Sequence, residues 1–405
     1  MEMKLPDGWE IAPIGEIFDT SSGTTPPRAM YDRYFRNGTI PWVKTLDLNN
    51  SEIHLTDEAV TDVALSETSL RIYTEGSVLV AMYGGFNQIG RTGLLRIPGS
   101  VNQAVTAILP NRKRVVPRYL LDFLNFNVGY WKTVASSSRK DPNITSNDVR
   151  TFPLTLPPLP EQSAIASALS DVDALLSSLD ALIAKKRDIK QAAMQQLLTG
   201  KARLPGFEGG WTVKRLDQLA NIRSGGTPST TVSRFWDGGI PWCTPTDITR
   251  LDGGKYLLDT SRQITPEGLS NSSAELIPAN SVVMTSRATI GECAINLKPV
   301  TTNQGFKNFV PFEDTDVSFL YYLLQTQRQG FIQLCSGSTF LEIGKTQLAA
   351  YKVHLPSTKV EQTAIAEVLS DMDAELAALE ARRDKTRLLK QGMMQELLTG
   401  KTRLV

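Results

Sequence analysis

Histidine and cysteine are scarce in this chain of 405 residues. The two histidines, His54 and His354, have no Cys, Asp or Glu partners at the spacing of metal ligands, so we expect no metal centre. The three cysteines, Cys243, Cys293 and Cys335, lie only in the second half, and their odd number offers no disulfide framework. The sequence therefore predicts a protein of a reducing compartment.

Neither one sign of charge nor a long apolar run dominates the chain. Lys and Arg number 43 against 42 Asp and Glu, so no overall basic field indicates nucleic acid, although a local basic face stays open. The first residues, MEMKLPDGWE, do not resemble a signal peptide, and no apolar run approaches the ~20 residues of a membrane helix. We expect a cytoplasmic protein of two or three domains, without a membrane partner.

The common enzyme motifs are missing as well. Gly344-Lys345-Thr346 resembles the end of a phosphate-binding loop, but the glycine that this loop needs would fall at Thr339. No GxGxxG follows a strand and no GxSxG elbow occurs, and Asp141-Pro142-Asn143 does not match the Asn/Asp-Pro-Pro-aromatic signature of amino-methyltransferases. The sequence therefore supports no enzyme and no cofactor bound by this chain.

A long internal repeat organises what is present. Residues 161–204 read EQSAIASALSDVDALLSSLDALIAKKRDIKQAAMQQLLTGKARL, and residues 361–404 read EQTAIAEVLSDMDAELAALEARRDKTRLLKQGMMQELLTGKTRL. The two stretches align without a gap and agree at 26 of 44 positions. A repeat of this length predicts a doubled unit.

Each copy of this repeat predicts a long helix with a heptad seam. Pro160 precedes the first helix, and Gly200 and Gly400 are placed to end the two helices. Apolar side chains recur at steps of four and three, which is typical of helices that pack side by side. The seam residues are Ile165, Leu169, Val172, Leu176, Leu179 and Ile183 in the first copy, and Ile365, Leu369, Met372, Leu376 and Leu379 in the second.

The repeat extends beyond the helices into two globular regions. SGTTP at 22–26 corresponds to SGGTP at 224–228, and FRNGTIPW at 35–42 to FWDGGIPW at 235–242. We expect globular regions at 1–156 and 205–356 and long helices at 157–204 and 357–405. The expected strands lie at 77–83, 104–110, 152–157, 281–286, 306–311 and 351–356, and shorter helices at 118–127 and 317–325. The fold class is therefore α+β, with two similar mixed α/β regions separated by two long antiparallel, coiled-coil-like helices about a pseudo-twofold axis.

These motifs together resemble the DNA-specificity (S) subunit of type I restriction–modification systems. The resemblance rests on the SG[GT]TP turn, the GxIPW segment, the Ile-Gly and Asn-Gln pairs, the PLPEQ helix entry and the LLTGKxRL exit, and it covers the whole chain. The second helix entry departs from the pattern, because it reads LPSTKVEQ.

The resemblance implies a non-catalytic subunit in which each globular region is a target recognition domain for one half of a bipartite, asymmetric DNA site. It implies double-stranded DNA, two methyltransferase subunits and restriction/translocase subunits as partners, with S-adenosylmethionine and ATP/Mg on those partners. Two alternatives stay open: a protein–protein scaffold that uses only the helix pair, and a fused methyltransferase, which the missing cofactor motifs disfavour.

Candidate base-reading residues lie where the two regions differ or carry polar pairs. Residues 77–89 exceed residues 281–290 by three positions, within YGGFNQ at 83–88. Amide side chains suit adenine and arginine suits guanine. The candidates are Lys44, Thr45, Tyr83, Asn87, Gln88, Arg91, Asn102, Gln103, Arg139 and Lys140 in the first region, and Thr244, Thr246, Arg287, Thr289, Asn303, Gln304, Ser338 and Thr339 in the second.

For each of these candidates the alternative is a solvated loop residue. The Asn-Gln pairs have a further alternative, because they can satisfy loop carbonyl groups instead of contacting DNA. Trp42 and Trp242 are expected to fill core rather than to stack on bases, and Gly23 and Gly225 to shape turns.

Overall fold

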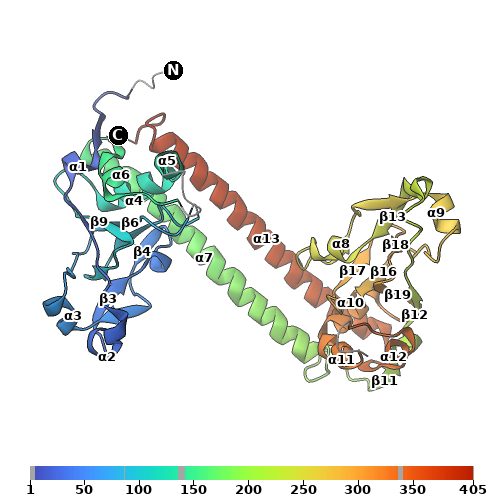
Figure 1. The fold of residues 1–405 in the computed structure, drawn as a ribbon. Coiled ribbons are helices and arrows are strands. Elements are labelled where there is room, and N and C mark those ends of the chain that lie inside the picture. The colour runs from blue at the N-terminus through green and yellow to red at the C-terminus, as the bar shows by residue number, and fades with distance from the viewer. Residues whose placement is uncertain (1–4, 86, 136–141, 336–340, 405) are drawn as a thin grey trace. The chain divides into compact units, whose positions relative to one another are not determined.

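The computed structural model describes residues 5–85, 87–135, 142–335 and 341–404. The chain forms two compact units: unit 1 comprises residues 1–180 and 382–405, and unit 2 comprises residues 181–381. Two long helices, α7 (Leu159–Leu197) and α13 (Lys359–Leu397), each contribute one half to either unit (Figure 1).

Unit 1 contains a five-stranded, a three-stranded and a two-stranded sheet, with strand orders β2-β9-β6-β7-β4, β5-β3-β8 and β1-β10. Its strands are β1 (Glu10–Pro13), β2 (Thr20–Ser22), β3 (Ile40–Val43), β4 (Ser51–Ile53), β5 (Glu58–Val60), β6 (Val78–Ala81), β7 (Thr92–Leu95), β8 (Ser100–Val101), β9 (Val105–Ile108) and β10 (Pro153–Leu156). Its short helices are α1 (Ile14–Ile17), α2 (Tyr31–Tyr34), α3 (Asp62–Glu67), α4 (Pro117–Phe126), α5 (Tyr130–Val134) and α6 (Ser146–Thr151).

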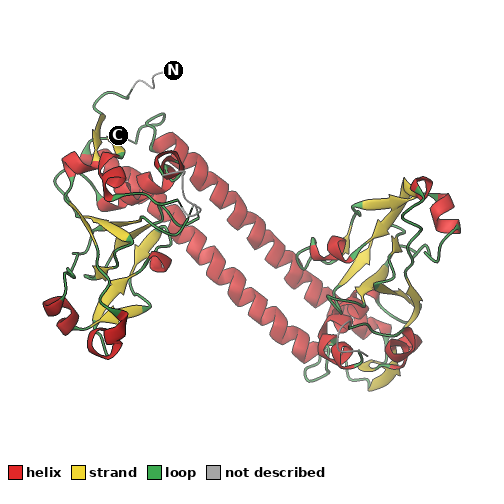
Figure 2. Ribbon diagram, in the orientation of Figure 1, coloured by secondary structure: helices red, strands yellow, loops and turns green. Residues whose placement is uncertain are grey.

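Unit 2 repeats these sheets strand for strand, as β12-β19-β16-β17-β14, β15-β13-β18 and β11-β20. Figure 2 shows strands in both units. Its strands are β11 (Trp211–Arg215), β12 (Ala220–Ser224), β13 (Trp236–Cys243), β14 (Tyr256–Leu257), β15 (Arg262–Ile264), β16 (Ser281–Thr285), β17 (Cys293–Asn296), β18 (Thr301–Thr302), β19 (Phe306–Pro311) and β20 (Lys352–Pro356). Its short helices are α8 (Pro245–Thr249), α9 (Pro266–Ser270), α10 (Val317–Thr326), α11 (Arg328–Gln333) and α12 (Lys345–Ala350).

The main core of each unit joins its five-stranded sheet to the long helices. In unit 1, α4 packs on β7, and the start of α7 packs with Leu397 and Leu398 from the end of α13. In unit 2, α10 packs on β17, and the start of α13 packs with Leu197 and Leu198 from the end of α7. Since the start of each long helix meets the end of the other in both units, the two helices are antiparallel.

All eleven seam side chains are buried or half-buried. Four of them, Ile165, Leu169, Ile365 and Leu369, are at most 1% exposed. Ion pairs flank the seam within each unit, such as Lys390–Asp173 at 2.6 Å in unit 1 and Lys186–Glu375 at 2.6 Å in unit 2. The seam therefore joins the helices to each other and to the core of each unit.

The repeated Glu-Gln and Lys-x-Arg motifs form a clamp at each helix entry. Arg403 donates to both oxygens of Glu161 (2.5 and 2.7 Å), and Trp9 Nε1 donates to the same carboxylate at 3.0 Å. Glu161 is fully buried, so this charge requires its partner. In unit 2, Arg203 donates to both oxygens of Glu361 in the same way (2.9 and 2.7 Å).

Gly200 and Gly400 follow the ends of the two helices with φ of 72° and 71°. This left-handed conformation is the usual helix stop that glycine provides. A Cβ atom on Gly400 would lie 2.4 Å from Pro6 Cγ, so glycine also permits close packing there.

The predicted α+β fold, with two similar mixed α/β regions and two long antiparallel helices, is confirmed. Each of the six predicted strands corresponds to an observed strand, and the predicted helices at 118–127 and 317–325 correspond to α4 and α10. Among the described residues, no helix is both long and apolar enough to cross a membrane.

Candidate nucleic-acid interface

Four segments of unit 1 lie side by side and are joined by backbone hydrogen bonds. The amide of Asn102 donates to Val43 O (2.9 Å), and the amide of Met82 donates to Ala104 O (2.8 Å). The amide of Ile144 then donates to Met82 O (3.0 Å). We call the joined segments 43–47, 82–85, 87–91, 102–104 and 142–146 loop cluster 1.

Unit 2 contains the same three hydrogen bonds. The amide of Asn303 donates to Cys243 O (3.1 Å), that of Ser286 to Gly305 O (2.7 Å), and that of Ile343 to Ser286 O (3.1 Å). We call segments 243–247, 286–292, 303–305 and 341–345 loop cluster 2. The backbone therefore presents candidate residues on equivalent frames in both units.

None of the described candidates is buried. The exposed ones are Tyr83, Asn87, Gln103, Thr246, Arg287 and Gln304, and the half-buried ones are Lys44, Thr45, Gln88, Arg91, Asn102, Thr244, Thr289 and Asn303. Arg139, Lys140, Ser338 and Thr339 lie outside the described residues. The loop clusters thus bring together fourteen of the candidates, and six of these are exposed.

The longer turn of loop cluster 1 is held in part by one of its own side chains. Arg91 Nε donates to Asn87 O at 3.0 Å, so this guanidinium stabilises the turn from within. The side chain of Gln88 lies against Gly84, where an added Cβ would be 2.2 Å from Gln88 Oε1. Tyr83, which is 42% exposed, and Asn87 remain directed toward solvent.

The shorter turn of loop cluster 2 carries a charged group instead. Arg287 Nε lies 2.9 Å from Glu342 Oε2, and the same two residues form a β-bridge. Lys307 lies behind this pair, with 6% of its side chain exposed and Nζ 4.0 Å from Glu342 Oε1. Burial lowers the pKa of Lys307, with the cations of Arg287 and Lys345 acting in the same direction and Glu342 opposing them.

At the position that corresponds to Lys307, unit 1 has Thr106, which lies near other side chains that carry hydroxyl groups. The oxygens of Ser22 and Ser146 lie 2.7 Å apart, and those of Ser22 and Thr106 lie 3.3 Å apart. Thr106 pairs with Ser22 in the sheet as Lys307 pairs with Ser224. The two clusters therefore share a backbone frame and differ in charge.

Several repeated residues support the loops from beneath. Trp42 and Trp242 are 1% and 5% exposed, and their Nε1 atoms donate to Thr24 O (3.2 Å) and Gly226 O (3.0 Å). A Cβ on Gly23 would lie 2.1 Å from Val101 O, so only glycine fits this close approach.

The asparagines of the two Asn-Gln pairs take part in turn structure. Asn102 Oδ1 accepts from the amide of Ala104 (3.2 Å), and Asn303 Oδ1 accepts from that of Gly305 (2.9 Å). Gln304 Oε1 accepts from Thr227 Oγ1 at 2.5 Å. These contacts shape the loops and leave the exposed amide edge of Gln103 on the surface.

Two further candidate segments, 44–45 and 244–246, form the caps of short helices. The amide of Lys44 donates to Asp47 (2.7 Å), and that of Thr244 donates to Asp247 (2.8 Å). Lys44 Nζ also donates to Glu58 at 2.8 Å. Lys44 is therefore partly neutralised, whereas Thr244 and Thr246 present neutral hydroxyls.

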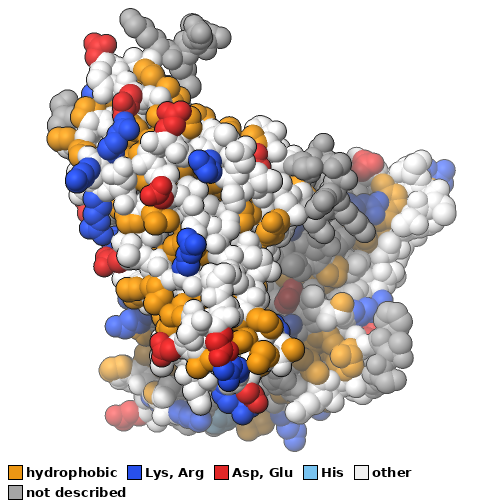
Figure 3. Space-filling model, turned by 60° about the vertical axis from the view of Figure 1, so that its left-hand side comes forward, with side chains coloured by type: hydrophobic (Ala, Val, Ile, Leu, Met, Phe, Trp, Pro, Cys, Tyr) orange, Lys and Arg blue, Asp and Glu red, His pale blue; other side chains and the backbone are white. Residues whose placement is uncertain are grey.

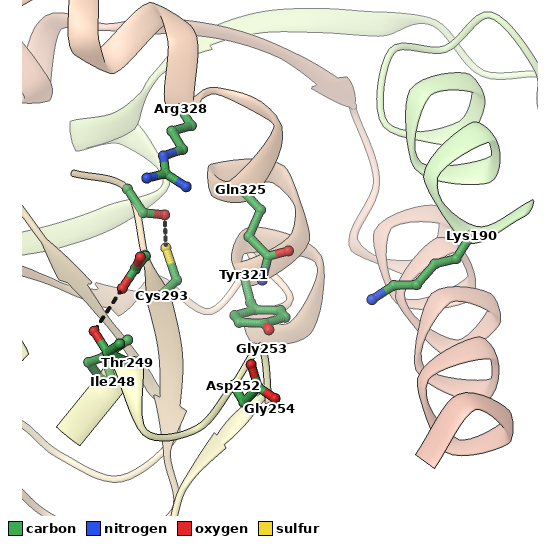
Figure 4. A pocket seen from close by; sticks show the side chains of 12 residues that line it. Lys190, Ile248, Thr249, Asp252, Gly253, Gly254, Cys293, Tyr321, Gln325 and Arg328 are labelled. Atoms are coloured by element: carbon green, nitrogen blue, oxygen red, sulfur yellow. Dashed lines mark hydrogen bonds between the residues drawn. The ribbon is translucent and has the colours of Figure 1, made fainter. Parts of the chain in front are cut away.

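A cavity of about 530 Å³ lies in unit 2 beside loop cluster 2 (Figure 4). Lys190 of α7 faces Tyr321 and Gln325 of α10 across it. Cys293 also lines the cavity, and its thiol is a poor nucleophile because burial raises its pKa. Among the described residues, no group of His, Cys, Asp and Glu could hold a metal ion.

Charges of both signs are interspersed on the molecular face shown in Figure 3. This agrees with the net charge of +1 and provides no broad basic field. With a net charge of +1 over the whole chain, we expect an interface built on the loop clusters to rely on a few placed side chains rather than on bulk charge.

Glu342 and Lys307 were missed by the sequence analysis. A signal existed for Lys307, since FKNFVP at 306–311 places a lysine within a strand where the first region has VTAI at 105–108. Glu342 had no such signal, because its contact with Arg287 spans 55 residues of sequence.

Comparison with known proteins identifies one family. The model of the type I restriction modification DNA specificity domain matches this chain twice, at residues 6–186 and 208–388. The type I restriction enzyme MjaIX specificity subunit of Methanocaldococcus jannaschii is 36% identical over 165 residues, which cover 40% of this chain and 38% of the relative. The EcoR124I/EcoR124II specificity subunit of Escherichia coli is 29% identical over 264 residues, which cover 61% of this chain and 62% of the relative.

The match thus spans less than two thirds of the length of both relatives. Among solved structures, the S subunit of a type I restriction–modification system from M. genitalium is similar over 97% of both chains, with a TM-score of 0.60 and 15% identity. This structural likeness concerns the fold.

Proposed function

The chain belongs to the family of type I restriction–modification DNA specificity subunits, and on that premise we propose that it reads a bipartite DNA target without catalysing a reaction itself. The relatives named above are specificity subunits of restriction enzymes. In this proposal loop cluster 1 reads one half of the target and loop cluster 2 reads the other.

One observation supports the proposal that the two halves of the target differ in sequence. The two loop clusters share three equivalent backbone hydrogen bonds but differ in the side chains that these bonds present. Loop cluster 1 offers Tyr83 and Asn87, and loop cluster 2 offers Arg287 paired with Glu342. Amide and guanidinium groups recognise different base edges, so the two half-sites should have unrelated sequences.

The partners in this proposal are double-stranded DNA, two methyltransferase subunits and restriction/translocase subunits. S-adenosylmethionine would be bound by the methyltransferase subunits and ATP/Mg by the translocase, in the cytoplasm. The near-neutral charge of this chain is compatible with that division, because the partners can supply much of the contact to phosphates.

Binding selection tests the DNA-reading part of the proposal. The full chain, co-purified with its methyltransferase, would select from duplexes with randomised sequence, and methylome sequencing of the host would report the modified site. We expect one target with two unrelated halves. A palindromic target would contradict the asymmetry, and the absence of any selected sequence would contradict the function.

Substitution of two equivalent apolar side chains tests how many methyltransferase subunits bind the chain. Leu389 in unit 1 and Ile189 in unit 2 occupy equivalent helix positions and are 59% and 43% exposed. We expect Leu389→Asp and Ile189→Asp each to remove one methyltransferase from the complex in native mass spectrometry, with an unchanged melting temperature of the free chain. A wild-type complex with a single methyltransferase would contradict the proposed stoichiometry.

A further inference from the structure

The turn that carries Arg287 does not fix this side chain by its own hydroxyl groups. Ser286 Oγ and Thr289 Oγ1 are buried and have no hydrogen-bond partner among the described residues. Ala288, between them, has a φ of 55°, a left-handed conformation that is uncommon for a residue with a side chain. The hydroxyl of Thr285 closes the turn itself, by donating to Thr289 O (2.6 Å) and accepting from the amide of Glu292 (3.2 Å). The restraint on the Arg287 side chain therefore comes from outside the turn.

Glu342 supplies such contacts at two levels. Its backbone forms a β-bridge with Arg287, and its carboxylate Oε2 lies 2.9 Å from Arg287 Nε. A guanidinium has five N–H donors in a rigid plane, so a partner at Nε fixes the direction in which both terminal nitrogens point. Those two nitrogens are the pair that can donate to O6 and N7 of a guanine.

Lys307 restrains Glu342 from behind. Its ammonium group is 4.0 Å from Glu342 Oε1, whereas Oε2 faces Arg287. Only 6% of the Lys307 side chain is exposed, so this cation belongs to the body of the unit rather than to the loop surface. Half of the Arg287 side chain, in contrast, is exposed. Lys307, Glu342 and Arg287 therefore form a row of charges that runs from the interior to the surface.

Among the described residues of unit 1, no row of charges corresponds to this one. The equivalent positions carry Thr106 for Lys307 and Asn143 for Glu342, according to the shared strand register and backbone bonds. The arrangement is thus specific to loop cluster 2, where a charged reading residue has to be held.

We propose that Glu342 is a positioning residue that determines specificity by fixing the guanidinium of Arg287 toward a guanine edge. The inference rests on the proposed function, since it requires that loop cluster 2 contacts DNA bases. It assigns to Glu342 a role in discrimination between base pairs rather than in overall affinity. As a negative charge near DNA, Glu342 by itself weakens binding to every sequence.

The test compares Glu342→Gln and Glu342→Ala in the full chain with its methyltransferase. Both variants remove the charge, but glutamine keeps an oxygen that can accept from Arg287 Nε. Affinity would be measured by fluorescence anisotropy at two salt concentrations. The duplexes would be the selected target and the single-base-pair variants of each half. Glu267→Ala is the matched control, because Glu267 pairs with Arg234 at 2.8 Å elsewhere in unit 2.

We expect Glu342→Ala to lower discrimination roughly tenfold at one base pair of one half-site, while binding to mismatched duplexes stays equal or tightens. Glu342→Gln should retain more discrimination than Glu342→Ala, and Glu267→Ala should retain all of it. Arg287→Ala should lose discrimination at the same base pair, and adding Glu342→Ala to it should cause no further loss.

Two outcomes overturn the inference and leave the proposed function intact. In one, both Glu342 variants change the affinity for all duplexes by the same factor, as expected of charge alone. In the other, Arg287→Ala leaves discrimination at every base pair unchanged. If the wild-type complex itself selects no sequence, the proposed function fails instead, so the two failures are distinguishable.

Discussion

Asp173 of unit 1 and Asp373 of unit 2 occupy equivalent positions on the long helices and pair with the equivalent lysines Lys390 and Lys190, but their second partners differ. Arg118 pairs with Asp173 and also with the buried Asp122 at 2.9 Å. In unit 2 the hydroxyl of Tyr322, at the position of Asp122, donates to Asp373 at 2.5 Å. The same interface therefore carries an arginine and a second carboxylate in unit 1, where unit 2 has a tyrosine hydroxyl.

Unit 2 has a further cation at this interface, from the segment that precedes β14. Lys255 Nζ donates to Ser370 Oγ at 2.8 Å and lies 4.8 Å from the centre of the Tyr322 ring. By contrast, the Glu161–Arg403 and Glu361–Arg203 clamps are the same in both units. The comparison teaches that the clamp depends on particular side chains, whereas the neighbouring contacts tolerate different chemistry if burial is preserved.

The largest expected effect concerns the seam. Leu376 is 8% exposed and Leu176 is half-buried, so the two equivalent positions differ in burial. Because a buried carboxylate without a partner is costly, Leu376→Asp should lower the free energy of unfolding by about 4 kcal/mol and Leu176→Asp by clearly less. Urea unfolding measures both, with Leu182→Asp at an exposed position as control. Equal losses in all three variants would contradict a buried seam.

The two interfaces should respond differently to the loss of Arg118 in unit 1 and of Lys255 in unit 2. Arg118→Met leaves Asp122, whose side chain is 2% exposed, without its partner, and we expect a loss of about 3 kcal/mol. Lys255→Met should cost about 1 kcal/mol or less, because Ser370 and Tyr322 keep other hydrogen bonds. Chemical unfolding compares the two variants.

The double variant Arg118→Met/Asp122→Leu serves as the control for this comparison. It removes both charges, so it should recover much of the loss. A cost for Lys255→Met as large as that for Arg118→Met would show that the chemical difference between the units has no energetic consequence.

The clamp of unit 1 should make the stability of the chain depend on pH, because it contains the carboxylate of Glu161. Burial raises the pKa of Glu161, but hydrogen bonds from Arg403 and Trp9 outweigh it and leave the pKa below its ordinary value. A depressed carboxylate pKa contributes stability that is present above the unfolded value of about 4.3 and is lost as pH falls through the folded pKa.

Glu161→Gln therefore should destabilise the chain most near pH 7, and the difference from wild type should shrink as pH falls from 5 to 3. Unfolding midpoints measured across this range provide the readout. A difference that stays constant with pH would contradict an ionised clamp.

The smallest effect concerns loop cluster 1. Asn87→Ala should weaken discrimination in one half-site by about 1 kcal/mol and leave the half read by Arg287 unchanged. The same duplex-variant titrations measure this change. An equal loss in both half-sites would mean that the two clusters do not read DNA separately.

Periodicity and repetition made the fold predictable from the sequence. The seam from Ile165 to Ile183 repeats at 3.5-residue spacing, and the aligned copies predict that each element of one unit has a counterpart in the other. The pairing of Arg403 with Glu161 was not predictable, because both residues look like ordinary helix-end charges and 242 positions separate them.

The candidate surface was predictable only in part. The difference in turn length between 77–89 and 281–290 located both turns, and Arg287 is exposed there. Sequence could not show that Arg91 is turned inward to Asn87 O, since that depends on the turn conformation. Nor could it show which side chain restrains Arg287, because the contact depends on how distant strands align.

The division of the chain also has a consequence for its synthesis. Unit 2 is one continuous stretch, residues 181–381, whereas unit 1 joins residues 1–180 to residues 382–405. The core of unit 1 includes Leu397 and Leu398, and the buried Glu161 is paired only when Arg403 is present.

A ribosome adds about 5–20 residues per second, so the first region would wait on the order of ten to forty seconds for the end of α13. During that time Ile165 and Leu169 lack part of their packing, while the region translated second can complete its own core. The order of folding should thus be the reverse of the order of translation, and the early part of the nascent chain should be the part that is prone to aggregate or to need a chaperone.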